Sequence, residues 1–385
     1  MNGTACAIVG IGETEVVRRS ERTSVALGLS AAVSAIRDAG LKPSDIDGVI
    51  SQQARPNPQA NISSLLAQRL GIQPVYVNDI SLSGGAPSAM VANAVAAIEA
   101  GLCTTVLCTS GGGDQPLSRE GKGRGRLSTG WEDFMNPFGA AAAPVSYALG
   151  ARRHMHAYGT TSAQFGAVAV ACRKHAQLNP NAVMRKPMTI EDHQTSRLLA
   201  DPYRLLDCCV PAQGAGAVIV TTAERARDLQ QKAVNVAGIG QSSIFATLEH
   251  AEALETSAAK GAAARAFAMA GLTPADIDMA QLYDPFTSVV LVTLEDYGFC
   301  AKGEGGAFVE GGRIELGGQL PVNTHGGLLS QGHLGGIAHI TEAVRQLRHQ
   351  GEERQVANAR TAVVSSQCAQ LGMHVSLILA NEKVH

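Results

Sequence analysis

The sequence is poor in several features that would point to particular classes of protein. Aromatic residues make up 4% of the 385 residues, too few for the stacking platforms that hold nucleic-acid bases. Charged residues make up 17%, with a formal net charge of −2, so we expect no broad basic surface for nucleic acid or an anionic membrane. No apolar run approaches the roughly 18 residues that span a bilayer. We therefore expect neither nucleic acid nor a membrane as a partner.

The eight cysteines also lack a pattern, because neither a paired spacing nor a CxxC motif occurs among them. The eleven histidines show no metal-ligand spacing with the cysteines, so we expect no metal site. No leader-like segment precedes the first apolar run of the chain. These features favour a reducing, cytoplasmic setting in which most thiols are buried as small hydrophobic groups.

What the sequence does contain is an internal repeat. AIRDAGLKPSDID at 35–47 and AFAMAGLTPADID at 266–278 are identical at eight of thirteen positions, with an offset of 266 − 35 = 231 residues. Each copy ends an alanine-rich helical pattern at a glycine, and a proline that cannot continue the helix follows. Two copies of this signal indicate two copies of one α/β half, with the cleft between them as the place for chemistry.

Strands and helices alternate along both halves, which predicts a parallel or mixed sheet covered by helices. In the first half, over 1–230, we expect strands at 5–10, near Val49, and at 75–77, 105–109 and 215–221, and helices at 23–39, 61–70 and 87–100. In the second half, over 231–385, we expect strands at 234–239, 280–283 and 361–365, another ending at 322–323, and helices at 257–270 and 337–347.

Residues 111–212 break this alternation. They begin with a polar, basic stretch at 121–134 and continue with a helical pattern at 146–158. An insert of this size is typical of a lid or a ligand-gripping subdomain, and a purely structural elaboration is the alternative. We expect it to be inserted into the first half.

Glycine-containing turns follow corresponding strands in the two halves. Such turns point backbone N–H groups and side chains into one cleft, and the N-terminus of the following helix stabilises negative charge there. The segment NTHGGLLSQGHLGG at 323–336 is the richest of these turns. Eight residues at the strand ends are candidates for the site: Ser81, Gly84, Tyr283, Asn323, His325, His333, Cys368 and Gly372.

The duplicated halves, the 323–336 segment, YDPFT at 283–287 and LEDYGFCAKGEGGAFVEGG at 294–312 resemble the thiolase superfamily, in particular its sterol-carrier-protein-type thiolases. In the insert, ARRHMHAYGTT at 151–161 and RLLADPYRLLDCC at 197–209 carry the same resemblance, which runs over about 5–379. The resemblance implies an α/β thiolase fold, with two duplicated βαβαβαββ-type halves in a five-layer αβαβα arrangement and an inserted loop subdomain.

Enzymes of this family make or break the bond between the α- and β-carbons of an acyl-CoA thioester. The resemblance therefore implies an acyl-CoA substrate and no cofactor besides the coenzyme A within it. His333 matches the histidine that activates the family's nucleophilic cysteine, Cys368 falls close to the second cysteine, and Tyr283 replaces the Asn or His of the oxyanion motif. The residues implied in oxyanion or substrate binding are Asn323, His325, Gly84 and Gly372.

Ser81 stands where the family carries its nucleophilic cysteine. A serine hydroxyl is far less ionised than a thiol and is a poor acyl acceptor without a base. A tyrosine at the position of Tyr283 is a feature of relatives that cleave branched 3-hydroxyacyl-CoA esters by a retro-aldol reaction. We expect that reaction, with Tyr283 and His333 transferring the proton. The alternatives are a thiolase or acyltransferase in which Cys368 or Ser81 takes the acyl group, and a catalytically silent acyl-CoA- or lipid-binding subunit.

The resemblance also implies partners for the chain. Related proteins form homodimers through the edge strand of the first half, and many of them pair with a small protein that contains a zinc ribbon and an OB-fold and helps to bind the acyl-CoA. We expect a homodimer, with the small protein as a further partner.

Overall fold

The computed structural model describes residues 5–52, 61–112, 137, 139, 142–246 and 248–382. The basic stretch expected at 121–134 lies outside these residues. The strands are β1 (Cys6–Glu13), β2 (Gly48–Gln52), β3 (Tyr76–Ile80), β4 (Thr105–Gly112), β5 (Leu198–Ala200), β6 (Tyr203–Arg204), β7 (Gly214–Thr222), β8 (Val234–Ser243), β9 (Met279–Gln281), β10 (Thr361–Cys368) and β11 (Met373–Ala380). The main helices are α1 (Ser24–Asp38), α2 (Ile62–Leu70), α3 (Ala86–Glu99), α5 (Ala143–Tyr158), α6 (Ser162–Gln177), α9 (Ala259–Ala270), α10 (Thr287–Tyr297) and α13 (Ile337–Leu347). Four-to-six-residue helices are α7 (Ile190–Thr195), α8 (Ala223–Ala226), α11 (Gly305–Phe308) and α12 (Gly327–Ser330).

Nine strands form one mixed sheet in the order β3-β2-β4-β7-β1-β8-β11-β10-β9. In the first half β2 is parallel to β3 and β4, while β7 is antiparallel to β4 and β1. In the second half β9 is parallel to β10, while β11 is antiparallel to β10 and β8. A parallel bridge between Ala280 and Val322 stands where the first half has β3. The two halves therefore share one strand order and one set of directions, which explains the repeat in the sequence.

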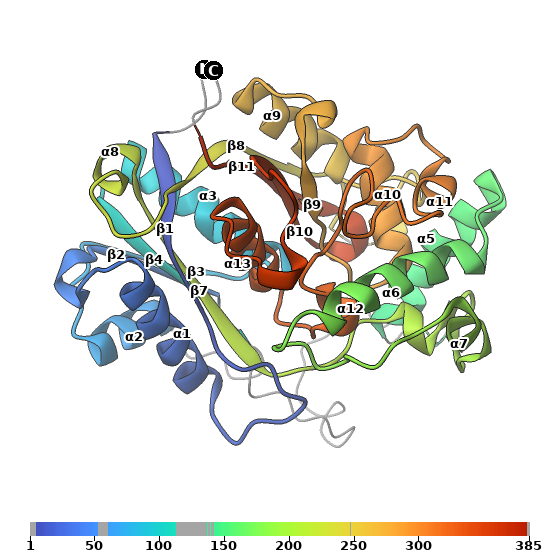
Figure 1. The fold of residues 1–385 in the computed structure, drawn as a ribbon, viewed down its shortest axis with the longest axis horizontal. Helices are drawn as coiled ribbons and strands as arrows, with labels where there is room; N and C mark the ends of the chain where they lie inside the picture. The colour runs from blue at the N-terminus through green and yellow to red at the C-terminus, as the bar shows by residue number, and fades with distance from the viewer. Residues whose placement is uncertain are drawn as a thin grey trace.

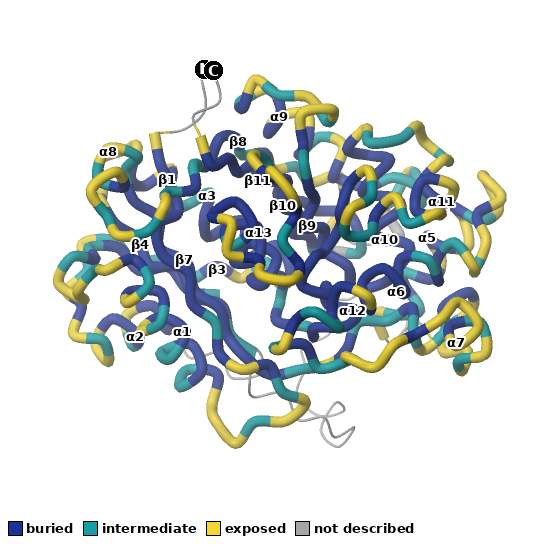
Figure 2. Tube along the Cα trace, in the orientation of Figure 1, coloured by how far each residue is buried: buried dark blue, intermediate teal, exposed yellow. Residues whose placement is uncertain are grey.

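Five layers result from this arrangement (Figure 1). Helices α3 and α13 lie in the middle and contact strands of both halves, while α1 and α2 cover the outer face of the first half and α9 and α10 that of the second. The two parts of the sheet join only where Ala7 pairs with Asn235 and Ile8 with Val234. The middle layer is thoroughly buried (Figure 2), since only one of the eleven residues of α13 is not buried.

A pair of glycines on the first strand of each half lets the outer helix come close. A Cβ added at Gly12 would lie 2.1 Å from the carbonyl oxygen of Ala31 in α1, and one added at Gly240 would lie 1.9 Å from that of Ala262 in α9. Only glycine fits at such a separation, and small alanines face it from the helix. The duplication therefore extends to the packing of β1 on α1 and of β8 on α9.

The described part of the insert packs on the second half of the molecule. Phe165 and Cys172 of α6 and Ala148 of α5 share a hydrophobic cluster with residues of α9 and α10, and the helices lie beside α10 and α12 in Figure 1. Whether the insert acts as a lid, and where the boundary near residue 230 falls, stay predictions. Within the described ranges, none of the helices has both the length and the apolar character needed to cross a bilayer.

Candidate active site

A cavity of about 460 Å³ opens where the two halves and the insert meet. A volume of this size suits a small-molecule ligand. Its described lining comes from the 14–23 loop after β1, the ends of β2 and β4, the turn before α3, the segment between β6 and β7, and the turns around 283 and 333. The lining residues are Arg18, Gln52, Ser81, Ser83, Gly84, Ser110, Gly111, Gly112, Cys209, Pro211, Ala212, Gln213, Tyr283, His333, Leu334 and Gly335.

Tyr283 and His333 form a hydrogen-bonded pair in this cavity. The Tyr283 hydroxyl lies 3.1 Å from Nε2 of His333, and the two rings meet edge to face at 6.1 Å. Tyr283 follows β9, and its backbone N–H donates to the hydroxyl of Ser365 in β10. The backbone N–H of His333 donates to the carbonyl of Val210 in the insert. Three separate segments of the chain therefore fix the pair.

Burial sets the protonation of both groups. It raises the pKa of Tyr283 well above 10, and the nearby tyrosine, cysteine and aspartate side chains raise it further, so the side chain is a phenol at neutral pH. Burial lowers the pKa of His333 below 6.5, although a contact with its own backbone carbonyl acts in the opposite direction. The Tyr283 phenol has a proton to donate, so we assign Nε2 of the neutral His333 as the acceptor and place the histidine's own proton on Nδ1.

Two glycines leave the space that the Tyr283 ring occupies. A Cβ added at Gly84, in the turn before α3, would lie 2.1 Å from the Tyr283 hydroxyl oxygen. A Cβ added at Gly336, whose φ is +96°, would lie 3.0 Å from the ring. The glycine-rich turns of the two halves therefore meet on either side of one tyrosine.

The groups that could act as nucleophiles in the cavity or near it are not activated. In the described part of the chain the Ser81 hydroxyl has no hydrogen-bonded base, and Nε2 of His333 is engaged by Tyr283. Burial raises the pKa of the Cys209 thiol to about 12 and that of the Cys368 thiol above 9, which keeps both as thiols at neutral pH. The site is arranged for proton transfer and not for covalent attack.

Four of the eight candidate residues are not among the described residues that line the cavity. The side-chain amide of Asn323 is fully buried, and both of its ends bond the backbone of Leu282, at 2.7 and 2.8 Å. His325 is buried and bonds Gln281 at 3.1 Å. In the described structure the side chains of Asn323 and His325 hold the turn in place, and their role in substrate binding stays a prediction.

Cys368 and Gly372 lie at the hairpin between β10 and β11. Cys368 ends β10 and is half-buried, close enough to Tyr283 for a charge on its thiol to raise the tyrosine's pKa. A Cβ added at Gly372 would lie 2.3 Å from the carbonyl oxygen of Phe245, so this glycine serves a close backbone contact. The catalytic role of Cys368 and the oxyanion-binding role of Gly372 stay predictions.

Sequence reasoning missed Arg18, Gln52 and Cys209 as lining residues. Gln52 ends β2, and its amide donates to the carbonyl of Ser83 at 2.8 Å, which ties one strand end to the next turn. The position of Gln52 at a strand end was a usable signal, whereas the approach of Arg18 and Cys209 depends on how a loop and the insert pack. Among the described residues, no group of three His, Cys, Asp or Glu side chains is placed to hold a metal ion.

Comparison with known proteins agrees with this fold. Residues 240–381 match the family model described as thiolase C-terminal domain-like. The chain is 41% identical to 17-hydroxy-3-oxo-4-pregnene-20-carboxyl-CoA lyase of Mycobacterium tuberculosis, over 89% of this chain and 91% of that protein. It is 38% identical to a steroid side-chain-cleaving aldolase of Thermomonospora curvata, over 89% and 90%.

Among solved structures, an Ltp2-ChsH2(DUF35) aldolase matches with a TM-score of 0.88 and 35% identity, over 98% of both chains. These likenesses confirm the fold and the family expected from the motifs, and they confirm the lyase expectation in preference to the acyltransferase alternative. The chain therefore belongs to the thiolase superfamily and to the aldolase-type carbon–carbon lyases within it.

Proposed function

We propose that this protein cleaves the Cα–Cβ bond of a 3-hydroxyacyl-CoA thioester by a retro-aldol reaction, with no covalent acyl intermediate. The observation that carries the proposal is the Tyr283–His333 pair inside the cavity. The histidine is neutral, and its Nε2 accepts a hydrogen bond from the buried Tyr283 phenol, whose oxygen lies 3.1 Å away. The unactivated state of Ser81 and Cys368 supports the non-covalent form of the reaction.

The proposed reaction conserves atoms and protons. Tyr283 accepts the proton of the substrate's β-hydroxyl as its own proton moves to Nε2 of His333. The Cα–Cβ bond then breaks, the β-carbon leaves as a ketone or an aldehyde, and the electron pair becomes the enolate of the remaining thioester. Cα takes up a proton from the pair, which returns the site to its starting state and releases a shortened acyl-CoA.

The enolate needs groups that favour negative charge. The turn of Ser83 and Gly84 lies in the cavity wall and leads directly into α3, a helix of 14 residues whose N-terminus faces that side. The partial positive charge of a helix N-terminus stabilises an anion there. None of the described lining residues is a carboxylate. These features support placing the thioester oxygen beside the turn.

The relatives suggest the acyl group. The Thermomonospora curvata protein is a steroid side-chain-cleaving aldolase, and the Mycobacterium tuberculosis protein is a lyase of a pregnene carboxyl-CoA. We propose, as the substrate class, a steroid side-chain CoA thioester that carries a hydroxyl on the β-carbon of its acyl group. The apolar part of the wall, from Pro211 and Ala212 to Leu334, suits a hydrophobic body of that kind.

Intact-mass analysis and product analysis together test the proposal. We expect a panel of 3-hydroxyacyl-CoA esters to yield a ketone or aldehyde plus the shortened acyl-CoA, with no mass added to the protein. An acyl adduct mapped to Ser81, Cys368 or Cys209 would establish the acyltransferase mechanism instead. Binding of the esters with neither adduct nor product would indicate a silent acyl-CoA-binding subunit.

Arg18 is suited to the coenzyme A end of the substrate. It is exposed at the cavity, and its guanidinium contacts the sulfur of Met184 at 2.9 Å. We expect Arg18→Ala to raise KM for an acyl-CoA by about two- to fivefold, because the free energy of an exposed ion pair corresponds to a factor of that order. KM for the matching acyl-pantetheine, which lacks the phosphates, should not change. Arg19→Ala is the matched control, and an equal effect of Arg18→Ala on both thioesters would contradict this role.

The chain is also proposed to have protein partners. The solved Ltp2-ChsH2(DUF35) aldolase supports a DUF35-type partner, which we identify with the zinc-ribbon and OB-fold protein expected above. Strand β3 is an edge of the sheet, and Val77 within it and Val75 just before it are 47% and 75% exposed, which supports a homodimer through β3. Val77→Lys should then yield monomers in sedimentation velocity. Co-purification from the native host tests the second partner, and a fully active homodimer without it would count against that partner.

A further inference from the structure

The residue after Tyr283 is a carboxylate with no access to water. Asp284 is fully buried, and its oxygens accept from the backbone N–H groups of Leu328 and Leu329 at 2.9 and 3.3 Å. They also contact Nε2 of His339 at 3.1 Å. Leu328 and Leu329 belong to α12, which leads into the turn that carries His333. Asp284 therefore joins the two chain segments that present the catalytic pair.

Gly327 makes this contact possible. A Cβ added at Gly327 would lie 2.0 Å from a carboxylate oxygen of Asp284. The φ of Gly327 is +61°, a value that residues other than glycine rarely adopt. The absence of a side chain at Gly327 thus leaves the space that the Asp284 carboxylate occupies.

His339 lies behind the pair. It is fully buried in α13, with its ring centroid 6.3 Å from that of Tyr283 and 4.7 Å from that of His325. Its Nε2 is engaged by Asp284, whereas its Nδ1 has no hydrogen-bond partner among the residues that the structure describes. A buried nitrogen without a partner is costly, so the contact with Asp284 is what keeps this histidine where it is.

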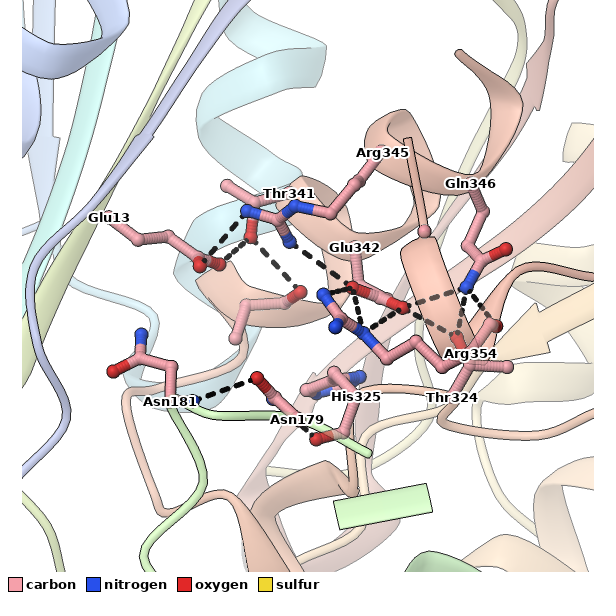
Figure 3. A network of polar contacts seen from close by, with 12 residues as sticks. Glu13, Asn179, Asn181, Thr324, His325, Thr341, Glu342, Arg345, Gln346 and Arg354 are labelled. Atoms are coloured by element: carbon pink, nitrogen blue, oxygen red, sulfur yellow. Dashed lines mark hydrogen bonds and ion pairs between the residues drawn. The ribbon is translucent and has the colours of Figure 1, made fainter. Parts of the chain in front are cut away.

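A buried polar network holds His325, and part of this network is drawn in Figure 3. The ring of His325 packs against that of His339. Gln281 contacts Nδ1 of His325 at 3.1 Å and donates to the Thr324 hydroxyl at 3.0 Å. Thr324 donates in turn to the carboxylate of Glu342 at 2.9 Å, and Arg354 binds the same carboxylate at 3.1 Å. The opposing arginines hold the pKa of Glu342 at about 2, against the effect of its burial.

The same network reaches the first half of the molecule and the insert. Arg345 bonds both Glu342 and Glu13 of β1, at 3.1 and 3.2 Å. Asn179, after α6, donates to the backbone carbonyl of His325 at 2.8 Å, and Asn181 beside it bonds the backbone of Val16 at 2.8 Å. The packing surface of His339 is therefore fixed by all three parts of the chain.

We infer that Asp284 and His339 are positioning residues of the reaction: they act through Tyr283 and His333, setting where the pair lies and when His333 carries a proton. The inference rests on the proposed role of Tyr283 and His333. Neither Asp284 nor His339 is among the described residues that line the cavity, so we place both behind its wall.

The two residues act on His333 in opposite directions. The charge of Asp284 raises the pKa of His333, while a proton on His339 lowers it. The other titratable groups near the two positioning residues are Tyr283 and Cys209, beside the pair in the cavity, Cys172 of α6, whose sulfur lies 3.9 Å from Asp284, and His325. Arg18 is the cation of the described cavity wall.

NMR titration of His333 in the free protein, assigned with a His333→Gln sample, tests the electrostatic half of the inference. We expect Asp284→Asn to lower the pKa of His333 by about one unit, since it removes a nearby negative charge, and His339→Gln to raise it, since glutamine cannot take up the proton that opposes protonation of His333. Equal titration of His333 in all three proteins would overturn the inference.

Kinetics test the positioning half. We expect His339→Leu to lower kcat about tenfold with KM within about twofold, and His339→Gln, which keeps a donor toward Asp284, to recover most of that loss. His154→Leu is the matched control. His154 is as buried as His339 and also bonds a carboxylate, that of Glu295 at 3.0 Å, but this bond does not involve Tyr283 or His333. Unchanged kcat in a folded His339→Leu protein, or an equal loss in His154→Leu, would contradict the inference.

The titration separates this inference from the proposed function, because it needs no substrate. If the parent protein cleaves no 3-hydroxyacyl-CoA, the retro-aldol proposal fails while the opposite shifts of His333 still appear. If the parent is active and the shifts are absent, the proposed function stands and the inference fails.

Discussion

Replacing Tyr283 with phenylalanine is expected to lower kcat for retro-aldol cleavage by about a hundredfold, with KM changed by less than about threefold. The substitution removes only the hydroxyl, and the ring keeps its place between Gly84 and Gly336. General acid–base catalysis by a positioned group typically contributes 10² to 10⁴ in rate, and each factor of ten corresponds to about 1.4 kcal/mol of barrier. Steady-state kinetics with one 3-hydroxyacyl-CoA measures the effect.

His333→Ala is expected to cost at least tenfold, and the double variant only slightly more than Tyr283→Phe alone. The two side chains act through one hydrogen bond of 3.1 Å, so their effects cannot add. Because burial lowers the pKa of His333, the acid limb of kcat/KM should lie below pH 6.5, where protonation removes the acceptor. An acid limb above pH 7 in the parent would contradict this assignment.

The control for Tyr283→Phe is Tyr297→Phe. Tyr297 is also buried and its hydroxyl also bonds a histidine, His374, at 2.8 Å, together with Ser376. It does not line the cavity in the described structure. This variant should lose stability and keep its turnover, so wild-type rates in Tyr283→Phe, or a large loss of turnover in Tyr297→Phe, would remove Tyr283 from the mechanism.

Local signals were enough to predict much of the fold. Helix α13 begins and ends as its apolar pattern predicts, and α9 ends at Gly271, whose φ of +67° is the left-handed cap that the repeated motif indicated. Other elements were missed: α10 is buried along its whole length, so it carries no polar face to reveal a helical period. The packing of the insert on the second half was also out of reach, because it depends on long-range contacts.

The candidate site, like the fold, could be predicted from the sequence only in part. The motifs identified Tyr283 and His333, but only the fold could show that residues 50 positions apart form a hydrogen bond. Asn323 and His325 have the polar side chains of ligand-binding turns, yet the left-handed φ of 54° at Asn323 accompanies a side chain that faces Leu282 and not the cavity. Asp284 follows Tyr283 directly, but its partners could not be read from the sequence, because it bonds the distant α12 and His339.

Adding one methyl group at Gly84 is expected to lower activity as much as removing the Tyr283 hydroxyl. The new Cβ would lie 2.1 Å from the Tyr283 hydroxyl oxygen, 2.2 Å from the ring carbon that bears it and 2.7 Å from the carbonyl oxygen of Gln367. The backbone of Gln367 lies on one side of the added methyl group and the Tyr283 ring on the other, so the ring must move. We expect Gly84→Ala to separate Tyr283 from His333, with a loss in kcat of about a hundredfold and a stability cost of about 1–3 kcal/mol.

Gly85→Ala separates this steric effect from the loss of glycine itself. The adjacent glycine is also buried in the turn before α3, but its added Cβ would meet only the flexible side chain of Met373, at 3.1 Å, and that of Leu82 at 3.7 Å. Met373 can move by changing rotamer, so Gly85→Ala should keep most of the activity. Because Gly84→Ala and Tyr283→Phe would damage the same hydrogen bond, their double variant should be little slower than either one. Additive losses would mean that Gly84 contributes through the turn and the thioester oxygen, independently of Tyr283.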